Sequence, residues 1–154
     1  QNRETTITGI HTFDGERADA YAGLSVTLSI ADNIDISRGD WINPAAQPAE
    51  VTKTRAADIC WFSDEELNTS RKYLIKHGTR TIAARINAID YKLDIHALEE
   101  RKAASDLQMN EIARVNLQLQ HALPTDAYSN VKAGGAFIVI DEATNQTLAA
   151  GMFA

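Results

Sequence analysis

The sequence predicts an all-β fold, and three observations support this prediction. Apolar and polar residues alternate with a period of two through most of the chain, whereas segments with helical spacing are scarce. Hydrophobic residues make up 44% and charged residues 23% of the 154 residues, which is ordinary for a globular protein. One long segment also switches the phase of its alternation, as bent strands do. We therefore expect antiparallel strands that bury one face and expose the other.

Four segments carry the alternation clearly, and in each of them the apolar side chains fall on one face. They span residues 24–30, 57–62, 71–78 and 115–120. The side chains that share a face are Leu24, Val26, Leu28 and Ile30, then Ala57, Ile59 and Trp61, then Tyr73 and Ile75, and finally Val115, Leu117 and Leu119.

The segment 81–95 is expected to form a long strand with a bend. Its apolar residues keep one phase up to Ala88 and the opposite phase from Ile89 onward. A slip by one residue turns the side chains over, so a bulge or bend is predicted at this pair. Long bent strands of this kind are common at the corners of barrels.

A hairpin and a short helical turn complete the expected elements. Residues 136–141 and 147–153 are predicted to be paired strands, joined by a turn at 143–146. Residues 94–107 contain helix formers after a possible capping aspartate, but their apolar spacing is poor. Only a short helical turn is expected there.

A change in composition predicts two units. Residues 43–57 carry two of the three prolines and few apolar residues, which is typical of a linker. We predict a first β unit at 1–44, a linker at 45–51 and a fuller β unit at 52–154. The first unit has too few strands to close a barrel by itself. The chain starts abruptly without methionine, so we expect it to be a piece of a longer protein.

Charge, hydropathy and cysteine content limit the partners and the compartment that we expect for the protein. The formal net charge is −6, which disfavours nucleic acid as the main partner, because neutralising phosphates requires clustered Lys and Arg. No run of 18 or more apolar residues occurs, so no membrane span is expected. Cys60 is the only cysteine, so an intrachain disulfide is excluded, and the cytoplasm is the simplest compartment.

The acidic stretch at residues 25–42 is the first candidate for a metal site, because it contains Asp32, Asp35 and Asp40. A calcium loop starting at Asp32 would have isoleucine at its third and fifth positions, where oxygen ligands are needed. A loop starting at Asp35 would end on Ala46 in place of the glutamate. Both registers fail, so the aspartates are interpreted as turn residues.

The remaining candidates also favour structural roles. The four histidines lie far apart and lack the spacing of a zinc site, and Cys60 lies inside a predicted strand. The glycine pair near residue 134 lacks the order of a phosphate-binding loop, so it is expected to allow close packing in a loop. The aromatic residues are expected to fill the core, because basic residues do not interleave with them. These candidates are His11, His77, His96 and His121, then Lys132, Ala133, Gly134 and Gly135, and then Trp41, Trp61, Phe137 and Phe153.

Residues 12–42 contain motifs that resemble those of a known protein family. Asp14-Gly15 precedes a strand there, and residues 32–40 read DNIDISRGD, where the family signature reads DEIDISRGD. Residues 61–98 and 124–153 are similar to the start and the end of the next domain of the same proteins. The chain therefore resembles the GTPase subunit of bacterial sulfate adenylyltransferase, whose barrels are similar to those of elongation factor Tu. Ala113 and Ala133 depart from the family pattern, and both are expected in turns that lead into strands; Ala127 also departs from it, in place of a common proline.

The resemblance implies a partial elongation factor Tu-like second-domain β-barrel followed by a complete third-domain antiparallel β-barrel. It also implies a preceding GTPase domain, where GTP and Mg²⁺ would bind, and a small catalytic subunit that transfers the adenylyl group. That complex makes adenylyl sulfate and pyrophosphate from ATP and sulfate, driven by GTP hydrolysis, and some members carry a fused adenylylsulfate kinase.

The chain contains no P-loop, no DxxG switch motif and no NKxD motif. We therefore expect no catalytic, cofactor-binding or metal-binding residue and no cofactor in this chain itself. Two alternatives stay open: a tRNA- or protein-binding barrel pair of another translational-type GTPase, and an independent barrel that binds a small molecule.

Overall fold

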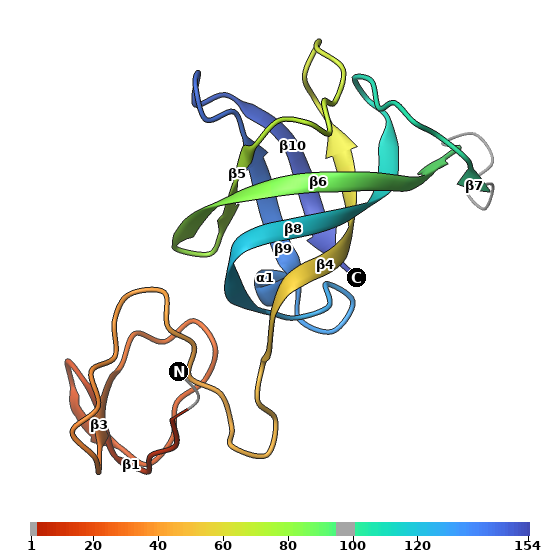
Figure 1. Cartoon of the computed structure of the whole chain (residues 1–154). Coiled ribbons are helices and arrows are strands. Elements are labelled where there is room, and N and C mark those ends of the chain that lie inside the picture. The colour runs from red at the N-terminus through yellow and green to blue at the C-terminus, as the bar shows by residue number, and fades with distance from the viewer. Residues whose placement is uncertain (1–2, 95–100) are drawn as a thin grey trace. The chain divides into compact units, whose positions relative to one another are not determined.

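The structure, a computed structural model, describes residues 3–94 and 101–154 and divides the chain into two units, Gln1–Asp40 and Trp41–Ala154 (Figure 1). The first unit is an antiparallel sheet with the strand order β2-β1-β3. The predicted face of residues 24–30 is confirmed, since its apolar side chains are half-buried and those between them are exposed. The strands are β1 (Ile7–Thr12), β2 (Gly15–Arg17) and β3 (Thr27–Ile30).

The second unit is an antiparallel barrel, so the all-β prediction is confirmed. Its described strands pair in the order β5-β9-β10-β4-β8-β6-β7, and pairing of β5 with β6 closes the ring (Figure 1). The elements are β4 (Glu50–Trp61), β5 (Tyr73–His77), β6 (Arg80–Leu93), β7 (Arg101–Lys102), β8 (Ile112–Thr125), α1 (Lys132–Gly135), β9 (Ala136–Ile140) and β10 (Thr147–Phe153).

The inside of the barrel is the hydrophobic core. The predicted apolar faces of β4, β5 and β8 all point into it, and their central side chains are buried. Trp61 meets Tyr73 edge to face, with ring centroids 6.0 Å apart, and Phe137 stacks on Phe153 at 4.5 Å. Alternation therefore places every second residue of these strands in one shared core.

The bend in β6 is confirmed. Ala84 and Ile86 are buried, the pairing with β8 shifts register on either side of Ala88 and Ile89, and Ile89 then packs against the core. At these shifts the side chains exchange faces, so apolar residues from both phases of the alternation pack into the core.

Other elements differ from the sequence prediction. β4 begins at Glu50 because its first half pairs with the end of β8, although its composition resembles a linker. α1 is a single helical turn where a loop was expected. In the segment where a helical turn was predicted, residues 95–100 lie outside the described residues, and Arg101–Lys102 pair with β6 as β7.

The outward side chains form two contrasting walls. On β8 they are polar, with Arg114, Asn116 and Gln118 half-buried on the surface. On the other side they are mostly apolar and are brought together by strand pairing, because Leu74 pairs with Ile140 and Ala150 lies between Ile138 and Cys60. We call the apolar side chains of this second surface the apolar outer wall: Leu74, Ile138, Ile140, Ala150, Cys60 and Met152. Two charged residues border it, since Lys76 pairs with Ile138 and Asp58 pairs with Met152.

Within residues 3–94 and 101–154, no helix has the length and apolar character needed to cross a membrane.

Candidate functional site

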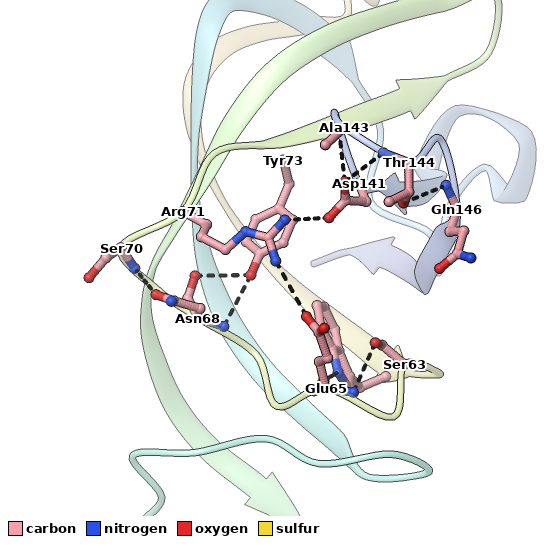
Figure 2. Close-up of polar contacts among 11 residues, drawn as sticks. Ser63, Glu65, Asn68, Ser70, Arg71, Tyr73, Asp141, Ala143, Thr144 and Gln146 are labelled. Carbon is pink, nitrogen blue, oxygen red and sulfur yellow. Dashed lines mark hydrogen bonds and ion pairs between the residues drawn. The ribbon is translucent and has the colours of Figure 1, made fainter.

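A groove of about 670 Å³ lies in the second unit between the β4–β5 loop and the β9–β10 turn (Figure 2). Its charged centre is the ion pair of Arg71 and Asp141, with Glu65 on the rim. Residues on both walls are far apart in the sequence and meet because β5 and β9 are neighbours in the barrel. Pockets of this size can hold small ligands, so the groove is the first place to look for function.

Asp141 organises the turn on one side of the groove. Its Oδ1 accepts hydrogen bonds from the backbone N–H groups of Ala143 at 2.7 Å and Thr144 at 2.9 Å, and its Oδ2 accepts one from Arg71. The N–H of Thr144, followed by that of Ala143 and the Arg71 guanidinium, lowers the pKa of this carboxyl group. Asp141 therefore stays ionised and is unsuited to act as a general acid or base near neutral pH.

Arg71 lines the other side of the groove and lies over the ring of the buried Tyr73. The Arg71 guanidinium lies 5.7 Å from the centroid of the Tyr73 ring and 3.6 Å from the Glu65 carboxylate. The Tyr73 hydroxyl accepts a hydrogen bond from the Asn68 N–H and donates one to the Asn68 carbonyl, both at 3.0 Å. Burial raises the pKa of Tyr73. Arg71 is thus held by two carboxylates, and Tyr73 is committed to the backbone.

The β4–β5 loop is pinned by similar contacts. The Trp61 Nε1–H donates to the Glu65 carbonyl at 2.7 Å, and Ser63 Oγ accepts from the Glu65 N–H at 3.1 Å (Figure 2). The polar groups in the groove therefore satisfy one another and fix two loops. In the described residues that line it, no serine or threonine hydroxyl is paired with a histidine base, as nucleophilic catalysis would require.

The acidic stretch of the first unit forms turns, as predicted. Asp40 Oδ2 accepts a hydrogen bond from the Ser37 N–H at 2.9 Å, and the Asp40 N–H donates to the Ser37 carbonyl at 3.0 Å. Asp32 Oδ2 instead accepts from the Thr5 hydroxyl at 2.8 Å. Asp32 and Asp40 are therefore held at separate places, and each is used by local structure.

The structure does not gather the described histidines and Cys60 into one cluster. His77 is buried in the barrel, His11 bonds to Ser29 in the first unit, and His121 is exposed. His96 lies outside the described residues. Cys60 lies on the apolar outer wall. Within the described ranges, no three His, Cys, Asp or Glu residues gather closely enough to hold a metal ion.

The glycine pair at Gly134 and Gly135 provides close packing, although in a helical turn and not in a loop. Both residues are buried in α1, and a Cβ on Gly135 would overlap the backbone of Tyr128. Trp61, Phe137 and Phe153 fill the core as predicted. Trp41 does not, because it precedes the first strand of the barrel and is only half-buried.

The Arg71–Asp141 pair was not predicted from the sequence. Asp141 begins the predicted turn, which is a usual place for aspartate, but only the barrel topology shows that Arg71 lies beside it. A charged residue before one strand and another after a distant strand give no local signal of their pairing.

Comparison of the sequence with known proteins identifies the family of this chain. The profile of the family described as "GTP-eEF1A C-terminal domain-like" matches residues 54–154. "Bifunctional enzyme CysN/CysC" of Mycobacterium tuberculosis is 42% identical over 97% of this chain. "Sulfate adenylyltransferase subunit 1" is 39% identical over 97% of the chain in Teredinibacter turnerae and 40% over 98% in Shewanella woodyi. These matches confirm the resemblance, although the chain spans only 25–32% of these relatives.

Solved structures confirm the fold. A protein named sup35 in its structure titles matches with a TM-score of 0.82 in complex with GDP and 0.84 in complex with GMPPNP. The sequence identity is 17% in both, and the match covers 97% and 99% of this chain but 37% and 38% of those chains. At this identity the likeness concerns the fold alone.

Proposed function

Because the chain belongs to the GTP-eEF1A C-terminal domain-like family, we propose that it is the non-catalytic β-barrel region of the GTP-hydrolysing subunit of a cytoplasmic sulfate adenylyltransferase. The observation that carries this proposal is the identity of 42% to "Bifunctional enzyme CysN/CysC", which extends over both units. The parent enzyme would form adenylyl sulfate and pyrophosphate from ATP and sulfate, with GTP hydrolysis as the driving reaction.

The glycine pair of α1 does not fit a phosphate-binding loop for GTP. A phosphate-binding loop needs backbone N–H groups that lead into a helix, whereas α1 has four residues and its glycines pack against the barrel. We propose that the nucleotide and the metal are bound by a GTPase domain outside this chain.

The role proposed for the barrels is mechanical. A closed, well-packed barrel moves as one body, so it can carry a change in the GTPase domain to the small adenylyl-transferring subunit. The apolar outer wall supports this role, because outward positions of a barrel in water are usually polar. We propose that the wall packs against another part of the enzyme.

An outer-wall substitution in the full-length subunit tests the proposal. Ile138→Glu places a charge on the wall without touching the core, so the barrel should fold while GTP-dependent synthesis of adenylyl sulfate falls at least about tenfold. Gln120→Glu, on the exposed side of β8, is the matched control and should leave synthesis unchanged. Equal activity of both variants would contradict the proposal.

The barrel pair of a tRNA-binding translational GTPase is the less favoured function, because the net charge is −6. Tight tRNA binding that weakens steeply with salt would favour that function over the one proposed here.

A further inference from the structure

Trp41 is the first residue of the second unit and directly follows Asp40, which ends the first unit. Its ring stacks on His77 of β5, with the centroids 5.7 Å apart and an interplanar angle of 30°. His77 is 3% exposed and is fixed itself, because its Nε2 lies 2.9 Å from the Gly134 carbonyl and its ring meets Phe153 edge to face at 5.4 Å. Trp41 therefore rests on a rigid, buried support.

α1 shapes the other side of this support. A Cβ on Gly134 would lie 2.8 Å from Trp41 Cη2 and would overlap the Asp126 carboxylate. Only glycine leaves the space that the indole ring occupies. The Asp126 N–H donates to the Gly134 carbonyl at 3.0 Å, which is the oxygen that also faces His77. The turn α1 and the histidine together form a fitted place for Trp41.

The proline-containing stretch after Trp41 begins and ends on the barrel. Trp41 is held on His77 at one end, and Glu50 pairs with Thr125 at the start of β4 at the other. Between them the chain makes its own turn, with the Gln47 N–H donating to the Pro44 carbonyl at 2.9 Å. The stretch 42–49 is thus a loop of the second unit.

We propose that Trp41 is an anchor that fixes the chain leaving the first unit onto the closed barrel through its stack on His77. The free connection then ends at Trp41 and does not extend through residues 42–49. The purpose of such an anchor, to pass a movement between the two units, rests on the proposed function. Its structural part stands on the contacts of Trp41 alone.

Limited proteolysis of the chain tests the anchor. Arg38 is exposed and lies three residues before Trp41, so trypsin cleavage after Arg38 reports how firmly this part of the chain is held. Trp41→Ala should speed cleavage at least about fivefold, the range expected for an aromatic pair, while the barrel keeps its amide protection. Ile42→Ala is the matched control, since Ile42 is 59% exposed, and should cleave as the parent chain does.

Two further variants keep the test decisive. Trp41→Phe keeps a ring on His77 and should restore most of the protection against trypsin. If Trp41→Ala does not fold, Trp41→Leu replaces it, because leucine retains apolar volume but cannot stack. Unchanged cleavage in the variant without a ring would overturn the anchor.

The anchor and the proposed function can fail separately. In the full-length subunit with its adenylyl-transferring partner, Trp41→Ala should retain GTP hydrolysis but lower the adenylyl sulfate formed per GTP. Faster cleavage with unchanged coupling would uphold the anchor and refute its mechanical purpose. Unchanged cleavage would refute the anchor whatever the enzyme does.

Discussion

In the second unit, six strands close into a ring around a core in which Trp61, Tyr73 and Phe153 are each 1% exposed. In the first unit, three strands with the same alternation form an open sheet, and no residue of the described range 3–40 is buried. Phe13 and Tyr21 lie fully or mostly in water there. Alternation is therefore sufficient to pair strands, whereas a core also requires enough strands to enclose it.

The largest expected effect tests the core directly. Leu117→Ala should lower the free energy of unfolding of the second unit by about 2–5 kcal/mol, because it leaves a cavity in a close-packed interior. Leu28→Ala, the control in β3, removes a half-buried side chain and should cost less than about 1 kcal/mol. Urea unfolding, followed by amide exchange in each unit, measures both. Equal losses in the free energy of unfolding would contradict the difference between the closed core and the open sheet.

A smaller effect is expected where two strands of the barrel come close. A Cβ on Gly151 would overlap the Phe137 ring, so Gly151→Ala should cost about 1–3 kcal/mol through overpacking. Ala150→Ser, one residue away and directed outward, should leave the melting temperature nearly unchanged. A stable Gly151→Ala variant would show that the barrel is looser than its contacts indicate.

The polar wall should contribute less than the core. Arg114 donates to both oxygens of Asp58, at 2.6 and 2.7 Å, and both side chains are about one quarter exposed. Asp58→Asn should lower the free energy of unfolding by about 0.5–1.5 kcal/mol, and less in 1 M salt. Glu65→Gln, at an exposed pair 3.6 Å from Arg71, should have little effect. A double-mutant cycle with Arg114→Met isolates the pair.

The last prediction concerns how the contribution of Asp141 to stability depends on pH. The folded-state pKa of Asp141 is lowered from its ordinary value of 3.8, so its stabilisation is fully present above that value and is lost as the pH falls through the folded pKa. The stability difference between the parent chain and Asp141→Asn should therefore shrink on acidification below about pH 4. Thermal melts from pH 7 to pH 2 measure it. A constant difference would show that the carboxylate charge is irrelevant to the turn.

The strands of the core could be predicted because each carries its own period-two pattern, as in Val115, Leu117 and Leu119. Even the bend at Ala88 and Ile89 left a local signature, the change of phase. The first half of β4 left none, because Thr52 and Thr54 gain their strand conformation from pairing with β8.

The groove was beyond prediction for a related reason. Its centre joins Arg71 to Asp141, and a contact between residues so distant in sequence depends on which strands are neighbours. The support for Trp41 is of the same kind, since His77, Gly134 and Phe153 come from three separate elements. Local patterns predict elements, whereas sites built between elements require the topology.

The central proposal is that this chain belongs to a sulfate-activating enzyme and carries none of its chemistry itself. The most direct measurement supplies the purified chain with GTP, ATP, sulfate and Mg²⁺ and follows phosphate and adenylyl sulfate, with the full-length subunit and its partner as the positive control. We expect no product above background from the chain alone. Turnover of GTP or formation of adenylyl sulfate by the chain would contradict it.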